Sequence, residues 1–313
     1  MSLKKKKGQV VVINGREVHM KPERYYWSDF LMVLPAVLLL ILVTYYPVAE
    51  LIRISFTDWR LTRSDYSYVG FKNWTWLFTA STSLRYLTES LTVTLEYTLF
   101  NILIDLGIGL ALAHLFNHLT KPFSVMRALI FMPRYIAMSS CGIIFLWMLN
   151  TDYGVVNKLL EFVGVSKHID WLGKGNALIS ILMLTGWHGV GYCMMIYLSA
   201  LLGISKDYYE ASSLDGATGF QQFRYITLPL LSPTTLFLFI TTFISSMKVY
   251  QSVDVMTGGK NGTSVMVYYI YDLAFNDNRI DRSAVTALLF FVILLIVTAS
   301  TMRITNKNVH YEA

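Results

Sequence analysis

Charged residues are scarce in this chain. Only 15% of its 313 residues are Asp, Glu, Lys or Arg, while 54% are hydrophobic and the mean hydropathy is +0.48. A soluble domain of this length carries about a quarter charged residues. The apolar residues also come in long blocks, so the sequence predicts a protein of the lipid bilayer.

Several signatures of chemistry are missing. The two cysteines, Cys141 and Cys193, lie inside apolar blocks, and no spacing of Cys and His suggests a disulfide or a metal site. The glycine-rich run 258–262 does not have the spacing of a phosphate-binding loop. No His-Glu-x-x-His motif is present to support an intramembrane enzyme. We therefore expect no ATP site and no cofactor in this chain.

The positive charge is concentrated at one end. The formal net charge is +6, and its densest group is Lys4 to Lys7, ahead of the first apolar block. Basic residues at a membrane flank usually fix orientation, so this charge is not read as a nucleic-acid signal. The first block is too long, and begins too far from Met1, for a cleavable signal peptide.

Six apolar blocks are long enough to cross a membrane as helices, which need about 20 residues. They cover residues 30–56, 89–116, 123–149, 177–202, 233–250 and 284–304, and the fifth is the shortest. We expect a cytoplasmic N-terminal tail at 1–29, a transmembrane domain at 30–306 and a cytoplasmic C-terminal tail at 307–313. Both termini are placed inside because the first helix usually dominates orientation, although the later loops show little bias in Lys and Arg.

The predicted cytoplasmic loop 204–229 is the most informative segment. Ser205 or Asp207 can cap a helix, and Gly216 and Gly219 allow a sharp bend. A second short helix over 220–225 should end before Pro229, because proline disfavours helix at the preceding residue. The loop is thus expected to form two short helices in a compact knob.

This loop resembles the EAA loop of bacterial ABC-importer permeases. The residues that carry the match, and that the resemblance assigns to ATPase coupling, are Glu210, Ala211, Ser212, Asp215, Gly216, Ala217, Gly219, Arg224 and Pro229. The resemblance implies an all-α membrane protein with six transmembrane helices and the type I importer permease (MetI-like) fold. It also implies a second, related permease, two copies of a separate ATPase that binds ATP and Mg, and an extracytoplasmic solute-binding protein.

Further segments resemble the sugar permeases of the maltose-importer kind. They are the helix 30–46 with Pro47, and the runs 54–57, 69–74, 108–113 and 256–259. The resemblance implies uptake of an oligosaccharide across the bacterial cytoplasmic membrane, with no nucleic-acid partner. It runs from about residue 30 to the end.

Polar residues inside the spans indicate where a sugar could pass. Thr185, His188 and Tyr192 are spaced to share one helix face, as are Thr241, Ser245 and Lys248. Arg134 follows a proline in the third block. The resemblance assigns these positions, together with Gly189 and Met138, to the substrate path.

Two of these residues are cations, and a buried cation needs a counter-charge. Arg134 and Lys248 could pair with a carboxylate of the partner subunit or with an acidic saccharide; Lys248 could instead reach the outer interface.

Glu96 and Asp105 lie nine residues apart, on opposite faces of one helix, so we expect packing or subunit-interface roles for them.

Three alternative functions remain open at this level. The first is an ABC permease for another solute, such as glycerol phosphate. An ion-coupled secondary transporter is less favoured because no internal repeat is visible. An intramembrane enzyme is the least favoured.

Overall fold

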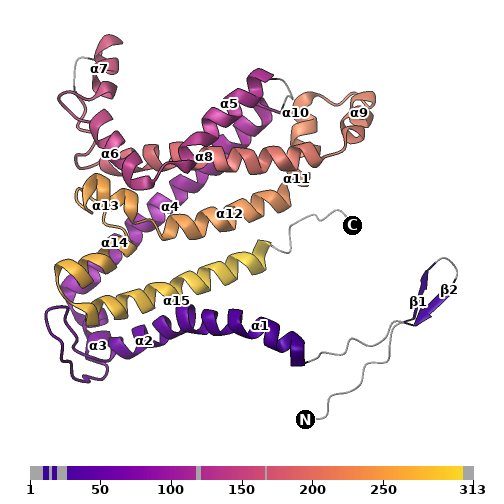
Figure 1. Cartoon of the computed structure of the whole chain (residues 1–313). Coiled ribbons are helices and arrows are strands. Elements are labelled where there is room, and N and C mark those ends of the chain that lie inside the picture. Colours follow the sequence, from indigo (N-terminus) through magenta and orange to yellow (C-terminus); the bar gives the residue numbers. More distant parts are fainter. Residues whose placement is uncertain (1–9, 14–15, 20–26, 118–120, 166–167, 306–313) are drawn as a thin grey trace. The chain divides into compact units, whose positions relative to one another are not determined.

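The computed structural model describes residues 10–13, 16–19, 27–117, 121–165 and 168–305. The chain divides into two compact units, Met1–Arg53 and Ile54–Ala313, and each is treated by itself. Figure 1 names the helices and strands. The six predicted spans all fall on helices, and this confirms the helical fold class.

The first unit contains an element that was not predicted. Strands β1 (Val10–Ile13) and β2 (Arg16–His19) pair antiparallel, with Val10 opposite His19 and Ile13 opposite Arg16. They lie within the stretch 1–29, which was expected to be a tail. The two residues between the strands read Asn14-Gly15, a strong sequence signal for a hairpin that could have been used.

The first predicted span follows this hairpin. It comprises α1 (Trp27–Leu40), a π-helical turn η1 (Ile41–Tyr45) and α2 (Tyr46–Ser55), whose end enters the second unit. Residues 30–55 form one helix long and apolar enough to cross a membrane. Glu50 and Arg53 form an ion pair within α2, so each charge in this apolar helix has a partner.

The second unit holds the remaining elements. In chain order they are α3 (Lys72–Thr79), α4 (Ser81–Leu115), α5 (Lys121–Phe131), η2 (Met132–Tyr135), α6 (Met138–Met148), α7 (Val155–Phe162), α8 (Ala177–Gly203), α9 (Lys206–Leu214), α10 (Gly219–Gln222), η3 (Phe223–Thr227), α11 (Leu228–Leu230), α12 (Ser232–Met247), α13 (Gln251–Thr257), α14 (Met266–Tyr271), η4 (Asp272–Asn276) and α15 (Ile280–Thr305). Helices α9 and α10 lie at one end of the long helices, and α3, α13 and α14 lie at the other (Figure 1).

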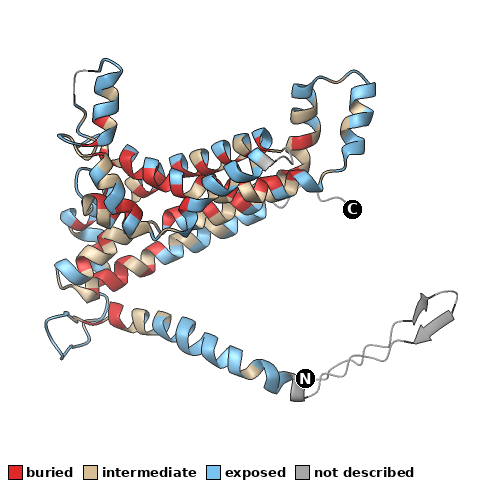
Figure 2. Cartoon of the chain, turned by 45° about the horizontal axis from the view of Figure 1, so that its top comes forward, coloured by how far each residue is buried: buried red, intermediate tan, exposed pale blue. Residues whose placement is uncertain are grey.

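Helices α4 and α8 form the centre of this unit. A Cβ atom added to Gly109 would lie 2.7 Å from Cys193 Cβ, and one added to Gly186 would lie 2.7 Å from Ile104 Cγ2. The two helices can therefore approach closely only because these positions are glycine. In the second unit, buried residues concentrate on α4, α8 and the helices beside them (Figure 2).

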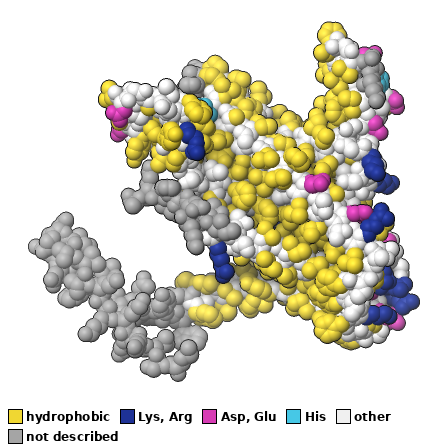
Figure 3. Space-filling model, turned by 180° about the vertical axis from the view of Figure 1, so that it is seen from behind, with side chains coloured by type: hydrophobic (Ala, Val, Ile, Leu, Met, Phe, Trp, Pro, Cys, Tyr) yellow, Lys and Arg dark blue, Asp and Glu magenta, His cyan; other side chains and the backbone are white. Residues whose placement is uncertain are grey.

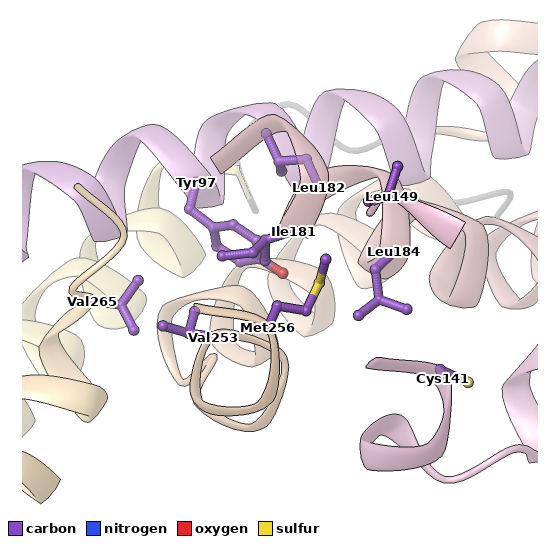
Figure 4. Packing of buried hydrophobic residues seen from close by; sticks show 9 residues of the cluster. All are labelled: Tyr97, Cys141, Leu149, Ile181, Leu182, Leu184, Val253, Met256 and Val265. Atoms are coloured by element: carbon purple, nitrogen blue, oxygen red, sulfur yellow. The ribbon is translucent and has the colours of Figure 1, made fainter. Parts of the chain in front are cut away.

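Around this pair, apolar side chains from distant parts of the chain form the core. Figure 4 shows one cluster, in which Tyr97 of α4 and Ile181 and Leu184 of α8 face Val253 and Met256 of α13. A second cluster joins Ala113 and Phe116 to Leu201 and Leu231. The middle of the face shown in Figure 3 is also largely hydrophobic, as a membrane-embedded protein requires.

The third predicted span is not one continuous helix. Residues 122–135 and 138–148 form two helices bent by 102°. Ile136 and Ala137 between them are extended, with ψ near 134° and 135°. Pro133 cannot donate a backbone hydrogen bond and is the second residue of a tighter 3-10 turn, so the α-helix ends before the extended pair.

The fifth span is bent as well, and one sequence expectation about it was wrong. The helix that begins at Gly219 does not stop before Pro229 but continues to Leu230, and α12 follows at 63°. The turn before the proline is π-helical: Leu228 N–H donates to Phe223 O, five residues back. This wider turn lets the helix pass through Pro229, which an ordinary α-helix would not accommodate.

Candidate functional site

The knob between α8 and α12 forms as two short helices. Ser205 caps α9, with its Oγ accepting from Asp207 N at 3.3 Å. Thr218 caps α10 in a capping box, in which its side chain and that of Gln221 each bond the other's backbone N–H. The predicted cap at Ser205 is confirmed, whereas the cap at Thr218 was not predicted.

Gly216 makes the bend between the two helices. Its φ is +81°, and Gly219 does not share this left-handed conformation. The amide of Gly216 donates to Ser213 O at 3.1 Å, and that of Ala217 donates to Ser212 O at 2.9 Å. This pair of bonds is a Schellman motif, which closes the C-terminus of α9 and requires a residue without a Cβ at Gly216.

Gln222, which was not among the predicted coupling residues, connects the two helices. Gln222 Nε2 on α10 donates to Ser213 Oγ at 2.8 Å, Ser212 Oγ at 3.0 Å and Tyr209 O at 3.1 Å, all on α9. The hydroxyl of Tyr209 also lies 2.9 Å from Thr227 Oγ1 in η3. These contacts make the knob one rigid piece that is joined to the helix leading into α12.

The outer surface of the knob is exposed and partly apolar. Leu214 is 91% exposed and Phe220 is 76% exposed, and α9 and α10 contain no buried residue. Most of the predicted coupling residues are exposed, and Ser212, Ala217 and Pro229 are partly buried. Exposed Leu and Phe on a braced, protruding segment are typical of a surface that contacts another protein.

A second group of predicted residues meets at the break in the third span. The guanidinium of Arg134 lies 5.2 Å from the ring centroid of Tyr192 on α8, a cation–π contact. His188 Nε2 lies 3.2 Å from Ile136 O, the carbonyl that the extended pair leaves without a helical partner. The structure thus brings Arg134 to His188 and Tyr192, which lie more than 50 residues further along the sequence.

Two neighbours complete this group. Met138 begins α6 directly after the break and is partly buried. Gly189 follows His188, and a Cβ added to it would lie 2.6 Å from Asp105 Oδ2. Asp105 was assigned to packing or an interface, and the structure places its carboxylate against the candidate path.

Thr185, in contrast, is bonded into the protein interior. It is 8% exposed, and its Oγ1 donates to Asn101 Oδ1 at 3.0 Å. Asn101 Nδ2 in turn reaches Ser246 Oγ and Asp105 Oδ2, each at 3.0 Å. Tyr97, Asn101 and Asp105 are four residues apart along α4, and this spacing was the sequence signal that could have identified the network.

The residues predicted on the fifth span lie on α12 and at its end. The hydroxyl of Thr241 donates to Phe237 O at 2.9 Å, and that of Ser245 donates to Thr242 O at 2.9 Å. Lys248 follows the last residue of α12 and is exposed. The two hydroxyls are satisfied within their own helix, so their oxygens remain available only as acceptors.

A cavity of about 950 Å³ lies beside the N-terminal half of α4. It is lined by residues of α4, the turn 258–264 and α14 to η4, with Glu96 and Lys260 among them. The predicted path residues are not part of its lining. Glu96 and Asp105 do lie on different faces of α4, as expected, since Glu96 is exposed and Asp105 is buried.

The chain is similar to known transport-system permease proteins. The sulfoquinovosyl glycerol transport system permease protein SmoG of Agrobacterium fabrum is 32% identical, with 88% of this chain and 89% of that protein aligned. The sn-glycerol-3-phosphate transport system permease protein UgpA of the same organism is 28% identical over 90% and 96% of the two chains.

The fold is shared with a solved structure. The crystal structure of a bacterial ABC transporter involved in the import of the acidic polysaccharide alginate contains a chain that superposes with a TM-score of 0.78 at 20% identity, covering 90% of this chain and 96% of that one. Residues 105–309 also match the family described as "Binding-protein-dependent transport system inner membrane component". This chain therefore belongs to that family of transport-system membrane subunits and has the fold of an ABC importer permease.

Proposed function

We propose that this subunit forms half of a translocation path for an oligosaccharide, delivered by an extracytoplasmic solute-binding protein. The other half is a second, related permease. Two copies of a separate ATPase subunit bind ATP and Mg and drive the cycle. In this arrangement both termini, the tail segments 1–29 and 307–313 and the knob within 204–229 face the cytoplasm.

The observation that carries the proposal is the construction of the knob. It is rigid, because Gln222 and the Schellman motif at Gly216 fix α9 against α10. It protrudes with apolar side chains at Leu214 and Phe220, and it continues without interruption into the bent fifth span. A force applied to such a knob reaches the membrane helices directly.

The cycle is one of alternating access. The loaded binding protein docks on the outer loops, and ATP draws the two ATPases together. The knobs then move the core helices so that the path opens outward, and hydrolysis restores the inward-facing state. ATP shifts this equilibrium only by binding the outward-facing state more tightly.

We further propose that the transported saccharide is acidic. Arg134 is exposed at the break of the third span, and Lys248 is exposed at the end of α12. Guanidinium and ammonium groups favour an anionic partner over a neutral sugar. Two similar permeases are named for sn-glycerol 3-phosphate and sulfoquinovosyl glycerol, both anionic, so a permease for a smaller anion such as glycerol phosphate is the second candidate.

The test is uptake by the reconstituted complex. The subunit, its second permease and its ATPase are assembled in proteoliposomes with the binding protein, and uptake of uronate, neutral and glycerol-phosphate substrates is measured with and without ATP. We expect ATP-dependent uptake of the uronate oligosaccharide. Arg134→Gln and Lys248→Gln should reduce it at least about tenfold, the loss of a charge-assisted contact.

The outcomes separate the candidates. Unchanged uronate uptake in both variants would refute the acidic-substrate assignment, and transport of glycerol phosphate alone would favour the second candidate. Uptake driven by an ion gradient without ATP would refute the importer mechanism itself.

A further inference from the structure

Helix α7, in the loop between α6 and α8, exposes large apolar side chains. Leu159 is 61% exposed, Phe162 is 91% exposed and Val163 is 79% exposed. Their spacing of three and four residues places them on one side of the helix as an apolar stripe, whereas Asn157 and Glu161 lie on the other side. An apolar stripe of this kind is unfavourable in water, so it indicates a surface that is covered in the working protein.

Asn157 holds α7 in this orientation. It is 3% exposed, and its Nδ2 donates to Thr151 O at 3.0 Å and to Ile169 O at 2.9 Å. Its Oδ1 accepts from Trp171 Nε1 at 3.0 Å and from the backbone amide of Ile169 at 3.2 Å. These hydrogen bonds join α7 to the segments before and after it, so the apolar stripe belongs to a fixed element.

Figure 1 shows α7 extending sideways from the end of the bundle, across the direction of α8 rather than along it. Helix α8 is long and apolar enough to cross a membrane, so a helix that runs across its end lies along the membrane surface. Amphipathic helices in this position bury their apolar side at the boundary between lipid headgroups and acyl chains. In the orientation proposed above, this surface is the extracytoplasmic one.

An apolar groove continues from α7 along the membrane-spanning helices. Its volume is about 790 Å³, and its lining consists of hydrophobic residues and one glycine, Gly186. Val156 of α7 and Met148 of α6 line it, together with Met183 of α8 and Ile108 of α4. Met183 is 40% exposed and Ile108 is 47% exposed, so the groove opens at the surface of the second unit. A groove of this volume without a polar side chain fits a hydrocarbon chain.

The groove lies on the side of α8 away from the predicted path. Successive residues in a helix are about 100° apart, so Gly186 and Val190, two positions before and after His188, lie on the opposite side from it. His188 contacts Ile136 O at the break of the third span. The second permease has to meet the His188 side to enclose the path, and this leaves the groove to lipid.

We propose that α7 lies in the extracytoplasmic lipid interface and that the groove beside it binds an acyl chain of a phospholipid. The occupant is lipid because the groove is continuous with the apolar surface of the spans and offers no polar side chain to a polar partner. The bound chain packs beside Pro133, which also lines the groove, and so supports the third span at its break. Only the side of the membrane and the face taken by the second permease rest on the proposed function.

Spin labels on two sides of α7 test its position. Leu159→Cys and Glu161→Cys lie on opposite sides of the helix, and each is labelled with a nitroxide in the complete transporter. Cys141 and Cys193 are buried, and the labelled wild type measures any background from them. The complex is reconstituted in vesicles of phosphatidylethanolamine and phosphatidylglycerol. Electron paramagnetic resonance then measures the collisions of each label with O₂, which concentrates in lipid, and with a water-soluble nickel chelate.

We expect the ratio of O₂ to nickel collisions to be at least about fivefold higher at Leu159 than at Glu161. Equal ratios at the two positions would overturn the interfacial placement. Shielding of the Leu159 label from both reagents would show that protein covers the stripe, and it would overturn the placement as well. If that shielding required the loaded binding protein, the stripe would be a docking surface for it instead.

Filling the groove tests the bound acyl chain. Met183→Trp enlarges a lining residue, and Leu103→Trp is the control, because Leu103 is exposed on α4 and is not among the residues that line the groove. Native mass spectrometry of the complex extracted from the same lipid mixture counts the retained phospholipids. We expect Met183→Trp to lose a phospholipid that the wild type and Leu103→Trp retain. Added phospholipid should raise the unfolding midpoint of these two proteins more than that of Met183→Trp.

Equal retention and equal midpoint shifts in all three proteins would overturn the lipid site. If Met183→Trp does not assemble, Ile108→Trp fills the groove from α4 and gives the same comparison. None of these measurements requires transport, so a wrong saccharide assignment would leave them unaffected.

Discussion

His188 Nε2 lies 3.2 Å from the carbonyl oxygen of Ile136, joining α8 to the point where the third span breaks. The carbonyl is partly buried in an apolar protein, where an unpaired acceptor is costly. For His188 to donate, its proton must be on Nε2, so this contact selects the imidazole tautomer. A residue predicted to line the substrate path thus also supports the bend of the third span.

Removal of the His188 donor should destabilise the protein at the break in the third span. We expect His188→Leu to lower the free energy of unfolding by about 1–3 kcal/mol, because Ile136 O then keeps only the weak contact with Cys141 Sγ at 4.0 Å. His188→Gln, whose amide can still donate, should retain most of the stability. Thermal unfolding of the purified complex compares the two, and equal losses would show that the hydrogen bond contributes little.

The bend of the knob should tolerate no side chain at Gly216. Gly216→Val places a β-branched residue at a φ of +81°, which costs about 1–3 kcal/mol and opposes the Schellman motif. We expect the complex to assemble but to hydrolyse ATP without transport, or with weak stimulation by the loaded binding protein.

Gly219→Ala is the matched control for this prediction. A Cβ at Gly219 meets no atom within 4 Å, and its φ is not in the left-handed region. The unfolding midpoint of the complex should therefore be close to wild type, whereas Gly216→Val should lower it. If both variants lowered the midpoint equally, the effect would not come from the backbone conformation of Gly216.

The bridge made by Gln222 gives a second test of the knob. Gln222→Leu removes three hydrogen bonds between α10 and α9, and we expect the knob to be destabilised by about 1–2 kcal/mol. Transport should fall more than basal ATP hydrolysis in reconstituted vesicles. Lys206→Gln, at the exposed start of α9, serves as the comparison and should behave as wild type.

The packing of α4 on α8 can be tested with two glycines of one helix. Gly109→Ala would place its Cβ 2.7 Å from Cys193 Cβ, so we expect a loss of about 1–3 kcal/mol in unfolding free energy. At Gly107 a Cβ meets no atom within 4 Å, and alanine there should be neutral or slightly stabilising. Thermal unfolding in detergent measures both, and similar midpoints would contradict the packing argument.

The sequence predicted the spans and the knob because each depends on local pattern. Long apolar blocks identify membrane helices directly. Serine is a common helix cap and glycine a common residue at a bend, so the local roles of Ser205 and Gly216 could be predicted from their residue types. The bends at 136–137 and 231 could not be located in this way. They depend on which carbonyls the neighbouring helices satisfy, and only the packed structure determines that.

The interior network shows the same limit. Thr185 was grouped with His188 and Tyr192 by helical spacing, and the structure adds a partner on another helix, because Thr185 Oγ1 donates to Asn101 Oδ1. Asp105 was separated correctly from Glu96 by spacing, although its nearness to Gly189 requires knowledge of how α4 packs on α8. Helix faces follow from sequence, whereas the partner of each face follows from tertiary structure.

The 102° break has a consequence for biogenesis. Its two arms each contain 14 or fewer residues, fewer than the roughly 20 needed to cross the bilayer alone. The segment 122–148 should therefore insert poorly into the lipid when it is synthesised without α8, because His188 of α8 hydrogen-bonds Ile136 O at the break. Its insertion is then expected to wait until residue 188 has emerged from the ribosome, so that the third span enters the membrane together with the fourth rather than before it.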